Sequence, residues 1–225
     1  MIDWQPIWLS LQLAGVTTLI LLVVAVPLGY WLAYSRRRWR TAVEALVSLP
    51  MVLPPTVLGF YLLLAFSPTS GLGRFLDRHF DLRLVFTFPG LVVASLLYSL
   101  PFMVNPVIAG FSGLSPDLRA ASRTLGKSDL TTLLKILLPN IRPSIITGTV
   151  LSFAHTVGEF GVVVMIGGSI PGQTRVASIA IYDEVQSMHY SLANHYAITL
   201  LCFSFGILLL VYLVNHHFNQ RKTIL

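Results

Sequence analysis

Residues 120–126 read Ala-Ala-Ser-Arg-Thr-Leu-Gly, and residues 136–139 read Ile-Leu-Leu-Pro. This polar, basic stretch lies between long apolar segments. A central glycine and a closing proline mark the limits of two short helices, because glycine commonly ends a helix and proline cannot continue one. The pattern indicates a structured loop at the surface of a chain that is otherwise embedded in a membrane.

The composition agrees with a membrane-embedded chain. Of 225 residues, 55% are apolar and 11% are charged, and the mean hydropathy is +0.75. A soluble domain is more polar than this. A spanning helix needs about 20 mainly apolar residues, because the hydrocarbon layer is about 30 Å thick. Five stretches qualify, at about residues 9–34, 43–66, 88–108, 141–168 and 196–214.

These stretches predict an all-α, polytopic transmembrane helix bundle of about five spans, in a single domain over residues 8–215. Helices are expected because lipid offers no hydrogen-bond partner to an exposed strand edge. The short alternating segments of a membrane barrel do not occur in the sequence. The single cysteine, Cys202, excludes an internal disulfide framework.

The basic residues predict the orientation. Eleven of them fall in the connections on one side, at positions 36, 37, 38, 40, 119, 123, 127, 135, 142, 221 and 222. The other side has four, at positions 74, 78, 83 and 175. Positive residues stay cytoplasmic. We therefore expect a multi-pass membrane protein, surrounded by lipid, with its amino terminus outside and its carboxyl terminus inside.

Both long outer connections contain a predicted helix. Apolar residues recur with helical spacing over residues 72–80, which suggests a short helix in the membrane interface. A second helix is expected at about residues 176–186, within the connection 169–195. Long connections in a compact bundle are usually functional. Both lie where an external partner could reach them.

Several predicted spans contain proline, at positions 27, 50, 54, 55, 101 and 106. Each proline removes a helix hydrogen bond and clashes with the preceding turn. One interpretation is ordinary kinks that serve packing. The other is a bundle that rocks between two states around an internal path. Polar residues at similar depth, namely Thr56, Ser95, Ser99 and Asn105, favour the second interpretation.

The loop at about residues 112–140 predicts two amphipathic helices. Ser115 is a candidate cap with Pro116 at the first helical position, and Gly126 ends this helix. Ser128 or Asp129 caps the second helix, which Pro139 ends. Such helices fit a groove of a partner protein. The alternative is that they lie on the lipid surface.

The loop resembles the docking motif of the membrane subunits of ABC importers, which is Glu-Ala-Ala, three residues, Gly, nine residues, Ile-x-Leu-Pro. The matching positions here are Ala121, Gly126, Ile136, Leu138 and Pro139. The chain departs from the motif at Ala120, which replaces glutamate, and at Ser122, which replaces alanine. The resemblance implies a type I importer permease fold in the bacterial cytoplasmic (inner) membrane and a loop that couples the chain to an ATPase.

Three further blocks, at residues 49–59, 158–161 (Gly-Glu-Phe-Gly) and 170–175, are similar to molybdate permease subunits of these importers. Sulfate and thiosulfate permeases share a related Gly-Glu-Phe-Gly block, and tungstate closely matches molybdate in size and charge. The resemblance implies a homodimer, two cytoplasmic ATP-binding subunits and an external oxyanion-binding protein. ATP and Mg would be used by the partner ATPase, so this chain is expected to bind no cofactor and to be no enzyme.

The path of the anion can be approached from the residues themselves. No Lys or Arg lies in the central part of a predicted span, so high affinity must reside elsewhere. Glu159 is the only acidic residue in the sequence that falls in the interior of a predicted span. An ionisable residue inside the membrane is a functional candidate. A carboxylate repels an anion, so a gate or a hydrogen-bonded structural role is favoured over contact. His155 is its candidate partner at i, i+4; the candidate path residues are Glu159, His155, Thr56, Ser99 and Asn105.

Other functions are disfavoured. Residues 167–174 have phosphate-loop spacing, but Gln173 replaces the essential lysine and no strand precedes them. The six histidines show no metal-ligand spacing, no catalytic set is present, and no soluble basic face suggests nucleic acid. A stand-alone ion-coupled carrier or channel is the alternative of another class. It would not need the docking loop.

Overall fold

The computed structural model describes residues 3–220, with the backbone alone for residues 210–211 and 214–220. All regular elements in this range are helical. In chain order they are α1 (Gln5–Tyr34), α2 (Trp39–Val52), α3 (Pro55–Phe66), α4 (Gly71–Phe80), α5 (Phe88–Ser112), α6 (Pro116–Thr124), α7 (Asp129–Thr132), a π-helical turn (Leu133–Leu137), α8 (Leu138–Asn140), α9 (Arg142–Gly158), α10 (Gly161–Gly167), α11 (Ala177–Gln186) and α12 (Tyr190–Gln220).

The centre of the bundle is made by α1, α5 and α9, with α5 packed against both of the others. Buried Leu21, Ala25 and Leu32 of α1 meet Met103 and Val104 of α5 in one apolar cluster. A second cluster joins α1 and α5 to α10 and α11. The core therefore lies where α1, α5 and α9 pack together, because lipid-embedded helices bury surface only against one another.

Within the part of the chain that the structure describes, three helices are each long and apolar enough to cross a membrane: α1, α5 and the part of α12 over Tyr190–Leu209. Two bent pairs raise the number to as many as five. One pair is α2 with α3, bent by 112°, and the other is Asp129–Asn140 with α9, bent by 72°. The all-helical membrane architecture is thus confirmed.

The predicted span at 43–66 is not a continuous helix. It breaks at Leu53 and Pro54, which have extended ψ angles of 137° and 136°. A residue before proline is pushed out of the helical region, and Pro55 then suits the first position of α3. By contrast, Pro27, Pro50, Pro101 and Pro106 lie inside continuous helices.

The predicted span at 141–168 is also interrupted, because α9 ends at Gly158 and α10 begins at Gly161. The predicted end of the second loop helix at Pro139 is wrong by one residue. Pro139 lies inside α8, directly after the π-helical turn, and the chain bends at Ile141. In that turn the N–H of Leu138 donates to the carbonyl of Leu133, so the wider turn admits the proline that follows.

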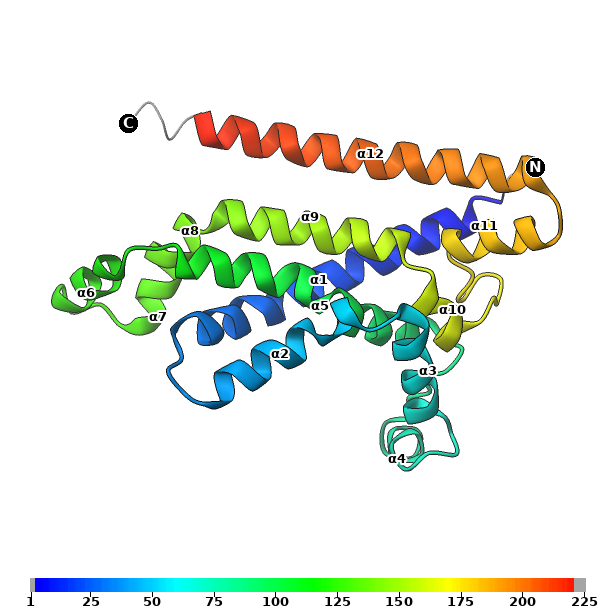
Figure 1. Cartoon of the computed structure of the whole chain (residues 1–225), viewed down its shortest axis with the longest axis horizontal. Helices are drawn as coiled ribbons and strands as arrows, with labels where there is room; N and C mark the ends of the chain where they lie inside the picture. Colours follow the sequence, from blue (N-terminus) through cyan, green and yellow to red (C-terminus); the bar gives the residue numbers. More distant parts are fainter. Residues whose placement is uncertain (1–2, 221–225) are drawn as a thin grey trace.

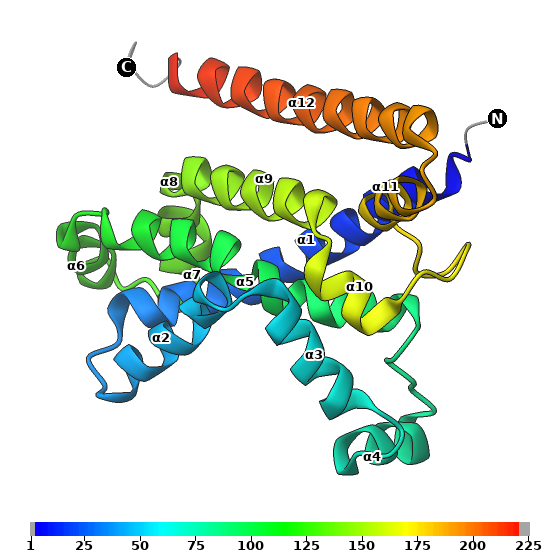
Figure 2. The ribbon, with the colours of Figure 1, turned by 45° about the vertical axis from the view of Figure 1, so that its right-hand side comes forward.

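Figure 1 shows α6 and α7 at one end of the bundle and α10 and α11 at the other. The helix α12 runs along the outside and is mostly exposed. Figure 2 shows α3 leaving the bundle with α4 at its tip. The helices expected in the two long connections are both present, as α4 and α11.

The contact between α3 and α10 depends on small residues. A Cβ on Gly59 would lie 2.7 Å from the Cβ of Met165, and one on Gly161 would lie 2.6 Å from the Cβ of Pro55. Both distances are shorter than side chains tolerate. The two short helices that follow the chain breaks, α3 and α10, therefore pack closely because glycine lies at their contact.

Candidate functional site

The first helix of the docking loop begins as its sequence predicts. The side chain of Ser115 accepts a hydrogen bond from the N–H of Asp117 at 3.2 Å, and Pro116 occupies the first turn of α6. The hydroxyl of Ser115 also donates to the Asp117 carboxylate at 3.1 Å. This cap fixes where α6 leaves the end of α5.

Gly126 reverses the chain after α6. Its φ is +68°, a left-handed conformation that side chains other than glycine rarely adopt. The N–H of Gly126 donates to the carbonyl of Arg123 at 2.9 Å, and that of Lys127 donates to the carbonyl of Ser122 at 3.1 Å. This hydrogen-bond pair is a Schellman motif. No atom outside the neighbouring residues would meet a Cβ here within 4 Å, so the constraint is the backbone angle.

A hydroxyl pair joins the two loop helices. The side chains of Ser122 and Thr132 are buried, and their oxygens lie 2.7 Å apart. Ser128 caps α7 by accepting from the N–H of Thr131 at 3.2 Å, which identifies it as the cap between the two candidates. The role of Ser122 was not predicted, since its partner comes from the next helix and spacing within one helix does not reveal it.

The loop at residues 112–140 divides into an exposed face and an anchor. Ala120 and Ala121 are exposed, and Leu125, Leu130 and Leu134 are 74%, 64% and 53% exposed. Ile136 and Leu138 instead pack against the buried cluster of Val107, Phe111, Leu137 and Ile141, and Pro139 is half-buried. The second part of the motif therefore fixes the loop to the bundle, while the first presents small and apolar residues outward.

Glu159 lies in the break between α9 and α10 and is 7% exposed. Its Oε1 accepts a hydrogen bond from the N–H of Val162 at 2.9 Å, in the first turn of α10. Its backbone carbonyl accepts from the hydroxyl of Ser178, in α11, at 2.6 Å. Glu159 thus connects α10 to α11, which belongs to the connection 169–195.

The predicted pair of His155 and Glu159 is not formed. Because α9 ends at Gly158, Glu159 is not one turn above His155 on a continuous helix. His155 Nδ1 instead lies 3.0 Å from the hydroxyl of Ser99, which is 2.9 Å from that of Thr156. The imidazole also stacks on Phe102, with ring centroids 4.0 Å apart. This network holds α5 against α9.

The remaining path candidates lie apart from that network. Thr56 is exposed at the start of α3, where its backbone N faces Gly161 of α10. Asn105 is half-buried, and its Nδ2 is 3.8 Å from the sulfur of Met51. Ser95 is fully buried, and its hydroxyl has no hydrogen-bond partner among the described residues. The structure brings His155 together with Ser99 but does not gather all the candidates into one site.

Arg175, considered above as a charge and as the last residue of the block 170–175, has side-chain partners that were not predicted. Its Nε is 3.1 Å from Asp183 Oδ2, and its Nη2 is 3.0 Å from Glu184 Oε1. Ser169 donates to the same Asp183 oxygen at 2.6 Å. Partial burial lowers the pKa of Arg175, but its hydrogen bonds to Glu184 and Asp183 outweigh this and raise it. In the sequence, the presence of Asp183 and Glu184 eight and nine residues after Arg175 could have indicated these ion pairs.

The chain was compared with known families and proteins. Residues 25–224 match the family described as "Binding-protein-dependent transport system inner membrane component". The chain is 46% identical over 211 residues to the molybdenum transport system permease protein ModB of Azotobacter vinelandii, covering 93% of each. It is 32% identical over 220 residues to the putative molybdenum transport system permease protein YvgM of Bacillus subtilis, covering 98% of this chain and 94% of that protein.

A third relative is the sulfate transport system permease protein CysT of Salmonella typhimurium, 35% identical over 182 residues, with 81% of this chain and 65% of that protein covered. Two solved structures have the same fold. A bacterial ABC transporter involved in the import of alginate gives a TM-score of 0.78 at 19% identity, covering 95% of this chain and 78% of that chain. The MetNI methionine ABC transporter gives 0.72 at 17% identity, covering 94% of each.

Proposed function

The chain belongs to the family of inner membrane components of binding-protein-dependent transport systems, and we propose that it is the permease subunit of an ATP-driven importer that carries molybdate into the cell. The observation that carries this proposal is the outward face of the docking loop. Exposed Leu125, Leu130 and Leu134 stand beside a glycine-based reversal at one end of the bundle. A carrier without a partner subunit has no need for such a face.

The partner at this face is a cytoplasmic ATPase. An amphipathic helix pair with small residues at its tip fits a groove of another protein. Two copies of this chain with two ATPase subunits form the complete transporter, and ATP and Mg are used in the ATPase. This chain contributes the path through the membrane and no catalytic residues.

The orientation follows from the same face. If α6 and α7 are cytoplasmic, then α10, α11 and the beginning of α1 lie outside, because they occupy the opposite end of the bundle. The loop 112–140 is then the coupling loop. The excess of basic residues in the connections on its side of the membrane supports this orientation. An external binding protein would deliver the anion near α11.

The substrate is a tetrahedral oxyanion. Molybdenum is named for two of the relatives and sulfate for the third, and the molybdenum relative from Azotobacter vinelandii has the higher identity. Molybdate is therefore our first proposal, with tungstate, sulfate or thiosulfate as the alternatives. The absence of a cation in the centre of the predicted spans supports tight binding in the separate external protein rather than in the path.

The break at Glu159 is the proposed gate. Its side chain holds α10, and its backbone accepts a bond from α11, so a shift of the outer connection reaches the broken helix directly. Rocking motions of broken helices serve alternating access in transporters. Glu159 acts here by positioning helices and does not contact the anion.

Reconstitution tests the proposal. The chain, its partner ATPase and its binding protein would be placed in proteoliposomes with ATP on the ATPase side, and uptake of labelled molybdate would be measured. We expect uptake to require ATP and both partners, to be inhibited by tungstate, and to be inhibited at least tenfold less effectively by sulfate. Uptake by the chain alone without ATP would instead establish a stand-alone carrier.

A further inference from the structure

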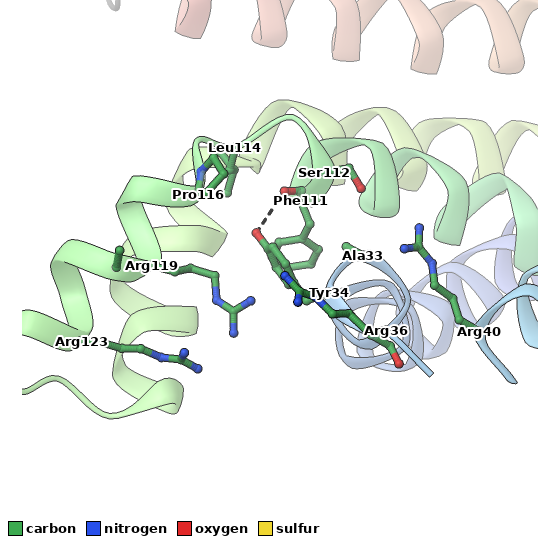
Figure 3. Close-up of a pocket in the computed structure, with 12 residues that line it drawn as sticks. Ala33, Tyr34, Arg36, Arg40, Phe111, Ser112, Leu114, Pro116, Arg119 and Arg123 are labelled. Carbon is green, nitrogen blue, oxygen red and sulfur yellow. Dashed lines mark hydrogen bonds between the residues drawn. The ribbon is translucent and has the colours of Figure 1, made fainter. Parts of the chain in front are cut away.

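A pocket of about 600 Å³ lies where the ends of α1 and α5 meet α6 (Figure 3). Tyr34 and Phe111 form its apolar wall. The side chains that give it its charge are all arginines: Arg36, Arg40, Arg119 and Arg123. They come from two segments about 80 residues apart in sequence, so that the fold gathers the charges in one place.

Arg119 is held in position by aromatic residues. Its Nη2 donates to the hydroxyl of Tyr30 at 3.2 Å, and its guanidinium carbon lies 4.2 Å from the ring centroid of Tyr34. The hydroxyl of Tyr34 in turn donates to the carbonyl of Phe111 at 3.0 Å. A guanidinium stacked on a ring keeps the N–H groups at its edge for another partner. The arginine is thus oriented without a carboxylate.

The positive charge in the pocket exceeds its negative charge. Arg40 is 3.7 Å from Glu44, and Arg123 is 3.2 Å from Asp129, so two of the arginines have a partner. Among the described side chains, no carboxylate lies within 4.0 Å of Arg36 or Arg119. Ala120 also lines the pocket, at the position where the docking motif has glutamate. Two positive charges are left for an external anion to balance.

We propose that this pocket binds a tetrahedral, phosphate-like oxyanion. Guanidinium groups match the oxygens of such an anion in geometry as well as in charge. The volume leaves room for its water shell, and pockets of this size commonly hold ligands. The anion is either a free ion such as molybdate, sulfate or phosphate, or the phosphate of a lipid headgroup. Bound there, it connects α6 to the end of α1.

Arginine modification locates the anion without measuring transport. The full chain would be placed in nanodiscs of phosphatidylcholine and treated with phenylglyoxal, and each arginine would be followed by peptide mass spectrometry. We expect millimolar molybdate to slow modification of Arg36 and Arg119 at least fivefold relative to chloride at equal ionic strength. The neighbouring arginines Arg37 and Arg38, which do not line the pocket, are the matched controls.

A second set of nanodiscs distinguishes the two sources. If phosphatidylglycerol protects Arg36 and Arg119 without added ion, the lipid headgroup is the ligand. If only molybdate, sulfate or phosphate protects them, the free ion is the ligand. If neither a free oxyanion nor phosphatidylglycerol slows modification of Arg36 and Arg119 relative to chloride and phosphatidylcholine alone, the proposal is overturned. Because uptake is not the readout, this result is independent of the transported substrate.

One substitution tests the charge argument. Ala120→Glu supplies a carboxylate to the pocket, and glutamate is a good helix former at this exposed position of α6. We expect it to abolish anion protection of Arg119, whereas the uncharged Ala120→Gln retains it. Full anion protection in the Ala120→Glu protein, with α-helical content unchanged by circular dichroism, would also overturn the proposal.

Discussion

The hydroxyl oxygens of Ser122 and Thr132 lie 2.7 Å apart and are the buried contact that fastens α6 to α7. Thr132 also donates to the carbonyl of Ser128 at 2.9 Å, so the pair leads back to the cap of α7. This pair therefore links the two helices of the loop through side chains that are ten residues apart in the sequence.

We predict that Ser122 and Thr132 are energetically coupled. Ser122→Ala and Thr132→Val each remove one hydroxyl, and each should weaken ATPase docking by about 1 kcal/mol, the usual net contribution of a hydrogen bond. The double substitution should cost little more than either one, because the shared bond is lost only once. Binding of the purified ATPase to the three variants measures this, and strictly additive losses would contradict the coupling.

Gly126→Val should uncouple transport while the bundle stays folded. The left-handed φ of +68° costs an ordinary residue about 1–2 kcal/mol, and a β-branched residue more. We expect ATP-driven uptake to fall at least tenfold with normal yield of the chain. Gly126→Asn is the matched control, since asparagine tolerates this conformation, and it should keep most of the activity. Normal uptake by the valine variant would exclude the reversal from coupling.

Glu159→Gln should impair uptake more than assembly. The amide oxygen can still accept from the N–H of Val162, but the bond loses its charge assistance. A change of 1.4 kcal/mol shifts a two-state equilibrium about tenfold, so uptake of labelled molybdate should fall several-fold at normal yield of the complex. Ser178→Ala, which removes only the bond to the Glu159 backbone, should have a smaller effect. Loss of the assembled complex in Glu159→Gln would assign the residue a structural role.

Arg175→Gln should destabilise the outer connection. The arginine is the shared partner of Asp183 and Glu184, and removing it leaves two carboxylates close together. We expect a loss of about 1–3 kcal/mol, as for a hydrogen bond to a charged group, visible as a lower midpoint of thermal unfolding. Combining it with Asp183→Asn and Glu184→Gln should restore part of the loss. If the combined variant is less stable than Arg175→Gln alone, charge repulsion is not the cause.

Reporter fusions test the orientation. A fusion after Ser70, before α4, should report an external position, and a fusion after Lys127, between α6 and α7, should report a cytoplasmic one. The physical reason is the concentration of basic residues in the connections around α6. The reverse pattern of activities would contradict both the topology and the proposed docking side.

The elements that could be predicted are those with local causes. Ser115 and Ser128 cap helices, Gly126 reverses the chain, and the helical spacing of 72–80 appears as α4, because each depends on residues a few positions apart. Such effects depend on backbone hydrogen bonds that are visible in a short window of sequence.

The remaining features depend on tertiary structure. Pro54 and Pro55 indicate a break, but the 112° bend between α2 and α3 is set by packing against α10. Because the helix ends before Glu159, the predicted i, i+4 pair of Glu159 with His155 does not form. His155 instead contacts Ser99, which lies on a different helix. The arginine pocket likewise needs the ends of α1 and α6 to meet, and no spacing along the chain reveals that.

The π-helical turn at Leu133–Leu137 sets the direction in which the docking face points. It inserts one residue more than an α-helical turn would, and one residue is about 100° of rotation around a helix axis. The helices α6 and α7, which precede the turn, are therefore rotated relative to the residues that follow it. The hydrogen bond from the N–H of Leu138 to the carbonyl of Leu133 belongs to this wider turn. The exposed Leu130 and Leu134 would therefore point in another direction relative to the bundle if these five residues formed an ordinary α-helical turn.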